Sequence, residues 1–580
     1  MKKLFLSLFI SFYLFSFGFS QEKYFVLKIV ECANNGAFRE VMQEGTEKFF
    51  AEEMVLKRLE NKISNLKQKG YLEASADSIS FTKDTIFAII HRGEKYEWEK
   101  INFRIDSNLN LTTLGLRSVN IKRKMLRFSN LDILQTKILN ELGNNGYPFA
   151  QLKISEISIT DKKINGEWEI IPHNLIRWDS IVLKGTSKLQ IKFLQRYLGI
   201  FPNKMYQENI SRSVSKKIGN LGFVKEIKAS EIEFDNERAR LYTYLEKVAA
   251  NQFDGIIGFQ TNKDNNKLEL TGEVKLTLEN IFSVGESIHF NWQKFAESSQ
   301  NLSLEFVYPY LFSSSVGVDF AFDIEKKDSA YLSTAIDLGI RFTQSGGNYS
   351  KLFFKRNSSS LLTTTHLVSA SVLPDYADVE SYLYGFAYHF ENLDYSFNPK
   401  KGWKLHFSIA AGTHKTKKNS SIPSELYEGM DLSNNLIDAE WVAEYNIPIQ
   451  EKVSFRLRNS GGVKDSKNLF QNDLFKLGGL NSFRGFNEDS FRASRYSQIT
   501  TELRFIPQAN TSFYLFADGG YYLNNYLQKK NEDYPLGIGF GLNFATKSGI
   551  FTLNYAVGKQ QGTKFDIQEA KIHFGFVSRF

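Results

Sequence analysis

Beyond about residue 250, the chain is built from short segments in which apolar and polar residues alternate, and the helical period is lost. Each segment is roughly ten residues long, as in membrane strands, and clusters of Gly, Asn, Asp, Ser and Lys separate one segment from the next. In "GIFTLNYAVG", Phe551 and Tyr555 share one face of a strand and Asn554 lies on the other. Such alternation places apolar and polar residues on opposite faces of a β-strand, so this part of the chain is predicted to be all-β.

The composition indicates a barrel that crosses a membrane. The chain has 51 phenylalanines and 27 tyrosines but 10 prolines, and after the N-terminal run no apolar stretch could span a bilayer as a helix. A closed barrel is the remaining structure that satisfies its backbone groups in lipid. At roughly 20 residues per strand and connection, residues 249–580 predict a transmembrane barrel of about 16 antiparallel strands. The alternative is a pair of soluble β-sandwiches.

The start of the chain predicts export. Lys2 and Lys3 precede an uncharged run rich in Phe and Leu, and Gly18 and Ser20 occupy the small-residue positions of a signal-peptidase site. We therefore expect residues 1–20 to be a signal peptide, with an uncleaved membrane anchor as the alternative. The single cysteine, Cys32, excludes an intramolecular disulfide framework. The charged residues close to it favour a structural thiol over a lipid anchor.

A repeat organises the segment between the signal peptide and the barrel. Gly70, Gly146 and Gly222 are 76 residues apart in each case, and each follows the end of an amphipathic helical pattern and precedes an aromatic residue and an alternating strand. Each glycine suits a left-handed helix C-cap. The complete pattern is strand, two helices, strand, strand, and it resembles the polypeptide-transport-associated (POTRA) module. The predicted units are residues 21–96, 97–175 and 176–248, of which the first is the poorest match.

The sequence favours neither nucleic-acid binding nor catalysis. The 72 basic and 64 acidic residues give a net charge of +8 without a long basic block, so no nucleic-acid partner is expected. The chain contains no His-Glu-x-x-His helix and no Gly-x-Ser-x-Gly elbow. Its eight histidines are scattered: His91, His173, His289, His366, His389, His406, His414 and His573. We expect a protein that is not an enzyme and needs no metal, nucleotide or other cofactor.

The stretch "LGGLNSFRGFNEDSF", residues 477–491, contains an arginine in a glycine-rich loop but lacks the residues of a phosphate-binding loop. Together with the signal peptide, the three POTRA-like units and the barrel, it resembles the BamA/TamA superfamily of outer-membrane assembly factors and its two-partner-secretion relatives. The family's loop motif reads here Phe483, Arg484, Gly485 and Phe486, with Phe in place of the commoner Val or Ile. Two further stretches, "LDYSFNPKKGWKL" and "FADGG", are similar to family strand patterns. The resemblance implies that the loop folds back into the barrel lumen.

A loop arginine inside a barrel needs carboxylates to receive its permanent charge. Glu502 points into the lumen by the alternation of "QITTELRFIP", and Asp518 shares a face with Tyr514 and Phe516 in "SFYLFADGG". We therefore expect Arg484 to bind Asp518 and Glu502, with the glycines allowing a close approach to the wall. The alternative is an arginine that caps an exposed hairpin.

The last strand, "AKIHFGFVSRF", is similar to the C-terminal signal of outer-membrane barrels. Phe574, Phe576 and the terminal Phe580 share one face of this strand. Gly575 interrupts it, and glycine in a strand weakens pairing or marks a bend, although an ordinary strand glycine is equally compatible with the pattern. In the resembled family the last strand meets the first, here near residues 253–259, at a seam that can open sideways.

The resemblance implies insertion of β-barrel proteins into the bacterial outer membrane, with the POTRA-like units in the periplasm. Exposed strand edges would bind unfolded client chains by β-augmentation, and the seam would admit new strands to the lipid bilayer. Three units indicate a plan closer to the TamA type, with a periplasmic or inner-membrane-anchored protein as a possible partner. One alternative is a pore that exports one soluble partner, although such relatives usually carry two units and a plug helix. The other is a passive barrel with a structural stalk.

Overall fold

The computed structural model describes residues 25–32, 38–40, 48–49, 51–82, 85–105, 128–261, 268–294, 299–395, 397–480, 482–527, 529–546 and 549–579. The chain divides into two compact units, Met1–Arg177 with Met205–Glu208, and Trp178–Lys204 with Asn209–Phe580. The expected signal peptide, residues 1–20, and the terminal Phe580 lie outside the described residues. Among the residues that are described, no helix is long and apolar enough to cross a membrane.

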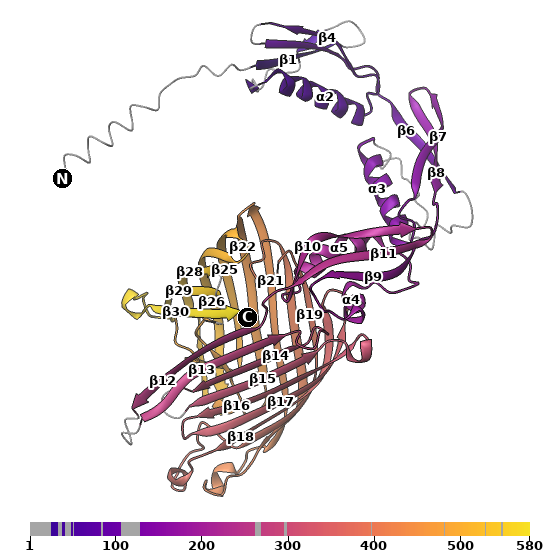
Figure 1. The fold of residues 1–580 in the computed structure, drawn as a ribbon. Helices are drawn as coiled ribbons and strands as arrows, with labels where there is room; N and C mark the ends of the chain where they lie inside the picture. The colour runs from indigo at the N-terminus through magenta and orange to yellow at the C-terminus, as the bar shows by residue number, and fades with distance from the viewer. Residues whose placement is uncertain are drawn as a thin grey trace, which may run out of the picture. The chain divides into compact units, whose positions relative to one another are not determined.

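The first unit contains two β-sheets, each accompanied by one helix (Figure 1). One sheet has the order β2-β1-β5-β4, with β3 also paired to β1, and the other has the order β6-β8-β7. Their elements are β1 (Phe25–Cys32), β2 (Phe38–Glu40), β3 (Lys48–Phe49), α2 (Glu52–Gln68), β4 (Ser75–Phe81), β5 (Thr85–His91), β6 (Glu97–Ile105), α3 (Phe128–Asn144), β7 (Gln151–Thr160) and β8 (Lys163–Ile171).

One helix packs on each of these two sheets through a single apolar stripe. In α2 the buried residues Val55, Leu59 and Leu66 recur at helical spacing and pack against the strand residues of the first core. In α3, Ile138 and Leu142 are fully buried and belong to one core with Trp168 of β8. Each sheet therefore has its own core, as expected for successive small α+β units.

The second unit contains the third α+β sheet, in the order β10-β11-β9, and the barrel. The elements of the sheet and its helices are β9 (Arg177–Gly185), α4 (Ile191–Leu198), α5 (Glu208–Gly219), β10 (Val224–Asp235) and β11 (Arg238–Lys247). Three sheets of this kind ahead of the barrel confirm the predicted fold class.

The predicted glycine C-caps are present in two units and absent in the third. Gly70 and Gly146 follow α2 and α3 with φ of 101° and 91°, in the left-handed region that favours glycine. Gly222 does not have a positive φ, and the last α5 residue is Gly219. The prediction of a left-handed cap at Gly222 is therefore wrong, because α5 ends earlier relative to the repeat glycine than α2 and α3 do.

The barrel runs from β12 to β30 in sequence order, with each strand antiparallel to the next (Figure 1). Its strands are β12 (Gln252–Thr261), β13 (Leu268–Glu279), β14 (Ser287–Lys294), β15 (Gln300–Tyr308), β16 (Val316–Lys327), β17 (Tyr331–Thr343), β18 (Tyr349–Leu361), β19 (Val379–Leu393), β20 (Gly402–Thr416), β21 (Ser433–Gln450), β22 (Val453–Asp465), β25 (Arg495–Gln508), β26 (Thr511–Tyr526), β27 (Lys529–Asp533), β28 (Leu536–Ala545), β29 (Gly549–Lys559) and β30 (Lys571–Arg579). Both β27 and β28 pair with β26, so they form one interrupted strand and the barrel has 16 strands.

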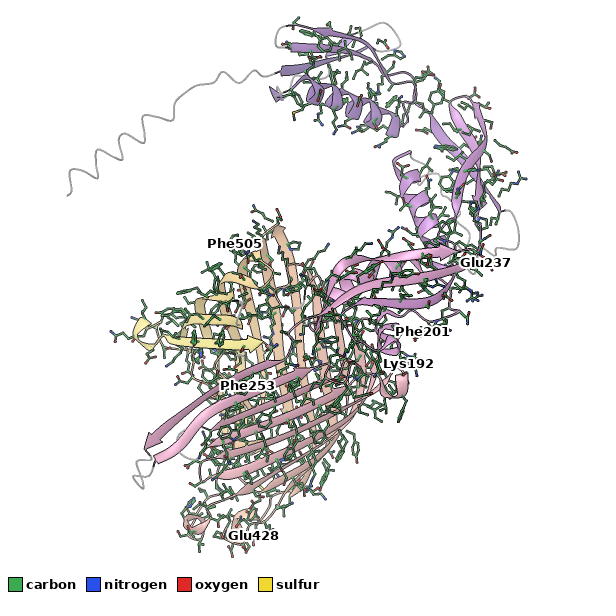
Figure 2. The ribbon with its side chains drawn as sticks, viewed as in Figure 1. Lys192, Phe201, Glu237, Phe253, Glu428 and Phe505 are labelled. Carbon is green, nitrogen blue, oxygen red and sulfur yellow. The ribbon has the colours of Figure 1, made fainter. Side chains whose placement is uncertain are left out.

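Alternation sets the two faces of the wall as predicted. On β25, Ile499, Leu503 and Phe505 are about half exposed on the outer face, whereas Glu502 and Arg504 are buried on the inner face. The aromatic Phe505 is labelled in Figure 2. An outer face of large apolar side chains suits lipid, and the buried charges belong to a polar lumen.

Candidate functional site in the barrel lumen

The segment between β22 and β25 folds into the barrel as a hairpin. Its short strands β23 (Phe475–Leu477) and β24 (Phe491–Ala493) pair with one another, with Leu477 opposite Phe491. The motif residues Phe483 and Arg484 lie between them and are buried, at 0% and 7% exposure. The motif loop is therefore inside the barrel, and the alternative of an arginine on an exposed hairpin is not what the structure shows.

Arg484 binds both of the carboxylates expected from the sequence. Its Nε donates to Asp518 Oδ2 at 2.7 Å and its Nη2 donates to Asp518 Oδ1 at 2.8 Å, which is a bidentate pair. Its Nη1 donates to Glu502 Oε1 at 2.9 Å. The backbone N–H of Arg484 also donates to Asp518 Oδ2, at 3.2 Å. One side chain thus joins the loop to two neighbouring strands, β25 and β26.

The ring of Phe516 lies against the guanidinium group of Arg484. The Cζ atom of Arg484 lies 3.6 Å from the centre of this ring, within the range of a cation–π interaction. Elsewhere in the loop, Phe491 stacks on Tyr522 and contacts Phe483 edge to face, with ring centres 5.0 and 6.2 Å apart. Arg484, Glu502 and Asp518 are all buried, and the low-dielectric surroundings strengthen their ion pairs.

Three further charged residues extend this ion pair into a network. Arg456 of β22 donates through Nη1 to Glu502 Oε2 at 3.2 Å and through Nη2 to Glu444 Oε2 at 2.6 Å. Arg504 lies 3.6 Å from Glu502 Oε2. Three guanidinium groups and three carboxylates therefore share the buried charge across β21, β22, β25 and β26.

Sequence reasoning missed Arg456 and Glu444. The sequence did contain a pattern that places Arg456 in the lumen: Arg456 and Arg458 alternate with apolar residues in "VSFRLRNS", just as Glu502 and Arg504 do in β25. Pairing them with partners required the strand register, in which Arg456 lies opposite Glu502 and Glu444 lies opposite Arg458.

Glycines in the barrel wall admit the backbone of the loop. A Cβ atom at Gly537 of β28 would lie 2.0 Å from the carbonyl oxygen of Arg484, and one at Gly558 of β29 would lie 2.7 Å from that of Gly485. Gly485 has φ of 96°, in the left-handed region, and its own Cβ would meet the backbone of Gly558. Close approach thus requires glycine on both sides of the contact.

The first and last strands meet over a short stretch. Among the described residues, β12 and β30 share two register pairs, Gln252 with Arg579 and Phe253 with Ser578, whereas β12 and β13 share ten. Figure 2 labels Phe253 at the start of β12, beside the last strand. The described part of the last strand is therefore held mainly by β29.

The C-terminal residues occupy ordinary strand positions. Phe574 is 67% exposed, and Phe576 packs against Phe551 of β29 with ring centres 4.4 Å apart. Gly575 lies opposite Thr552, and the nearest atom to an added Cβ would be 3.9 Å away. Gly575 is thus neither crowded nor bent into the left-handed region, so steric need does not explain it.

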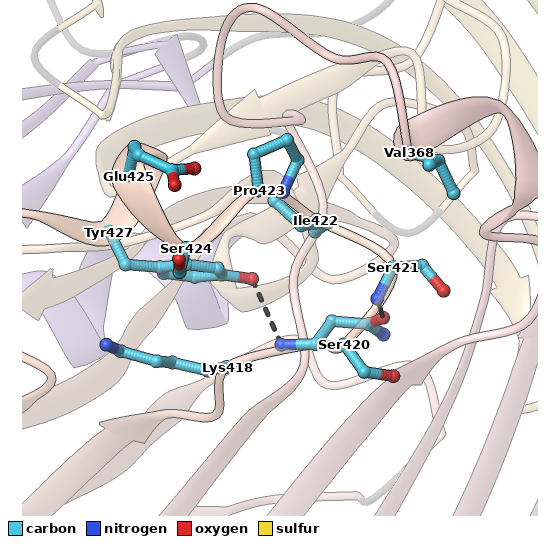
Figure 3. A pocket seen from close by; sticks show the side chains of 10 residues that line it. Val368, Lys418, Ser420, Ser421, Ile422, Pro423, Ser424, Glu425 and Tyr427 are labelled. Atoms are coloured by element: carbon cyan, nitrogen blue, oxygen red, sulfur yellow. Dashed lines mark hydrogen bonds between the residues drawn. The ribbon is translucent and has the colours of Figure 1, made fainter.

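A hollow lies among loops that connect barrel strands (Figure 3). It has a volume of about 500 Å³ and lies between residues 418–427 and Val368. Its hydrogen bonds are local, such as the one from Asn419 N to the Tyr427 hydroxyl at 3.3 Å. Among the described residues no group of three or more His, Cys, Asp or Glu side chains could hold a metal ion.

A barrel with an internal, arginine-anchored loop and preceding α+β units defines a class of bacterial outer-membrane proteins with periplasmic POTRA-like units. Residues 280–580, more than half of the chain, match the Omp85 superfamily domain. The chain therefore belongs to the Omp85 superfamily.

Individual relatives are distant. The outer membrane protein assembly factor BamA of Neisseria meningitidis serogroup B is 20% identical over 448 residues, which are 73% of this chain and 54% of the relative. The chain thus spans about half the length of this curated relative. The structure of CdiB from Acinetobacter baumannii covers 91% of this chain and 98% of its own, with 15% identity and a TM-score of 0.51. CdiB from Escherichia coli covers 91% and 97%, with 12% identity and a TM-score of 0.50. At these identities the two structures show a shared fold.

Replacing Arg484 by Ala should release the loop and leave the barrel folded. Removing one partner of a buried pair typically costs about 3–5 kcal/mol, because Asp518 and Glu502 would stay buried without their counter-charge. We expect proteinase K added to intact cells to cleave residues 477–491 in the variant, while an unheated gel still shows the compact barrel. Arg484→Lys should protect only partly, since an ammonium cannot make the bidentate contact.

The matched control is Arg495→Ala. This residue pairs with Asp465 at 2.5 Å, and both side chains are at least half exposed, so its loss should leave the loop protected. Equal protection of the loop in Arg484→Ala and the unaltered protein would show that the ion pair does not hold it.

Replacing Gly537 by Ala should expel the loop from the lumen although every charged residue of the network is unchanged. The added methyl group would overlap the Arg484 carbonyl, and a strand backbone has little freedom to move away. Trypsin should then cleave after Arg484 in intact cells. Gly575→Ala is the control, because its methyl group has room. Resistance of Gly537→Ala to trypsin would contradict the role assigned to the wall glycines.

Proposed function

We propose that this protein inserts β-barrel proteins into the outer membrane, and that the seam between β12 and β30 is where client strands enter. The observation that carries the proposal is the two-pair contact between these strands, beside the ten pairs of β12 with β13. Unpaired backbone groups are costly in lipid, so a strand edge with few partners is ready to pair with an incoming strand. Membership of the Omp85 superfamily and the similarity to an assembly factor support the same function.

The α+β units supply the sites for the first contact with a client. Each of the three sheets has an edge strand at one end of its order: β4 in the first, β7 in the second and β10 in the third. An extended client chain can add to such an edge by β-augmentation, through backbone hydrogen bonds that do not depend on its sequence. Sequence-independent capture suits a protein that handles many unfolded clients. Neither step uses a metal or a nucleotide, and we assign no catalytic residue.

Export of one soluble partner through the lumen is the second candidate. The shared fold with the CdiB structures is compatible with it. The anchored loop weighs against it, because Arg484 and the aromatic residues around it occupy the lumen. Export would require the loop to leave, whereas insertion at the seam would require β12 and β30 to part.

A disulfide across the seam should separate these functions. In a Cys32→Ser background, Phe253→Cys and Ser578→Cys would place two thiols at a register pair. Oxidation should abolish folding of an outer-membrane protein client into vesicles that contain the protein, and a reductant should restore it. The control is Leu304→Cys with Phe322→Cys, a register pair within the continuous wall.

Two outcomes would count against the proposal. Unchanged client folding with the seam fully crosslinked would show that insertion does not use it. Crosslinking that leaves export of a soluble partner intact, with no effect on the outer-membrane protein content of cells, would favour the second candidate.

A further inference from the structure

A cleft of about 160 Å³ lies between α4 of the third α+β unit and two turns of the barrel. Helix α4 contributes Lys192 and Phe193, and the turns contribute Val284, Leu311 and Phe312, with Tyr308 at the end of β15. Figure 2 labels Lys192 on this helix. The volume is several times the roughly 30 Å³ that one water molecule occupies in the liquid. The helix and the turns belong to the same compact unit.

The walls of the cleft are fixed by specific contacts. Phe193 is 5% exposed and meets Tyr310 edge to face, with ring centres 5.7 Å apart. Gly285 leaves space for the same ring, since a Cβ there would lie 2.1 Å from it. The Nε of Arg196 donates to the carbonyl oxygen of Ser313 at 2.6 Å. The cleft is therefore a preformed feature.

The cleft lies on the outside of the barrel, at the end where the chain enters from the α+β units. Tyr308 ends a row of outward residues on β15 that also contains Leu304 and Phe306, whereas Glu305 between them lines a cavity in the lumen. The turns after β13 and β15 lie at the end of the barrel where the chain enters from the α+β units, because successive strands are antiparallel. This end faces the periplasm, so the cleft faces the inner leaflet of the outer membrane.

Large apolar side chains are exposed on the two turns that line the cleft. Phe312 is 91% exposed, Phe282 is 60% exposed and Ile281 is 48% exposed. Phe312 also has φ of 50°, in the left-handed region that a bulky residue rarely adopts, and such strain marks functional positions. Aromatic residues at this level of a membrane barrel insert between headgroups and acyl chains.

The cleft also offers one cation. Lys192 is exposed, and within the described residues its ammonium group makes no ion pair or hydrogen bond. A lysine beside an apolar crevice at the bilayer surface complements a phosphodiester whose acyl chains continue into the membrane.

We propose that this cleft binds one phospholipid of the inner leaflet. The phosphate pairs with Lys192, and the glycerol and upper acyl chains lie against Tyr308 and Phe312. The aromatic residues lie at the boundary of the lipid-facing surface, which favours a lipid over a protein partner. The inference goes beyond the proposed function, and it holds whether the chain assembles or exports its clients.

Photocrosslinking of the full chain tests the site. A benzophenone amino acid at Phe312, in vesicles of phosphatidylethanolamine with a minor fraction of phosphatidylglycerol, should form a covalent phospholipid adduct that mass spectrometry detects. Phe234 of β10 is the control position. It lies near Glu237, which Figure 2 shows at a distance from Lys192, and it should give little adduct.

Charge variants test the phosphate contact. Lys192→Gln should lose most of the adduct at position 312, Lys192→Arg should retain it, and Lys204→Gln should match the unaltered protein, since Lys204 lies beside Asn203 at the β10–β11 end of the unit. Equal yields at positions 312 and 234, or equal yields in Lys192→Gln and Lys204→Gln, would overturn the proposal. Crosslinks in cells that join position 312 to a protein and not to lipid would overturn it too. Compact migration of each variant on an unheated gel shows that its barrel has folded.

Discussion

The buried ion pair of Arg484 with Asp518 and Glu502 is the interaction on which the arrangement of the lumen depends. Removing a guanidinium group from water costs free energy. This cost is offset here by two carboxylates, by the strand backbones that hold both carboxylates beside Arg484, and by the face of the Phe516 ring. Glu502 is also held by Arg456 and Arg504, so the loop completes a charge balance that spans four strands. Wall glycines then let the loop backbone lie directly on β28 and β29.

This network divides the barrel into a reinforced wall and a weak seam. The strands that carry the network, β21, β22, β25 and β26, are long and extensively paired, and the loop contacts them from inside. On the other side of β29 the last strand has eight register pairs with its neighbour and two with β12. A barrel that opens at the seam could thus keep its lumen charges paired, because none of the described network residues lies on β12 or β30.

Much of the architecture could be predicted from the sequence, and the reasons are local. Alternation identified the lumen face of Glu502 and Asp518, and the single arginine among glycines identified the residue that needed them. The network beyond them could not be predicted in the same way, because the pairing of Arg456 with Glu444 depends on a register set between two long strands. Gly222 shows that a local pattern can also mislead, since a repeat in the sequence does not require the same backbone φ angle in each copy. The cleft beside Lys192 joins segments more than a hundred residues apart, and no local pattern links Lys192 to Phe312.

Site-specific photocrosslinking from the seam to a client during insertion is the most direct test of the account. With a photoreactive residue at Phe253 on β12, the account predicts covalent products with the terminal strand of an outer-membrane protein arrested during its insertion, and few products from the same residue at Leu304 on β15. Crosslinks of equal strength from both positions, or from neither, would contradict the claim that client strands enter at the junction of β12 and β30.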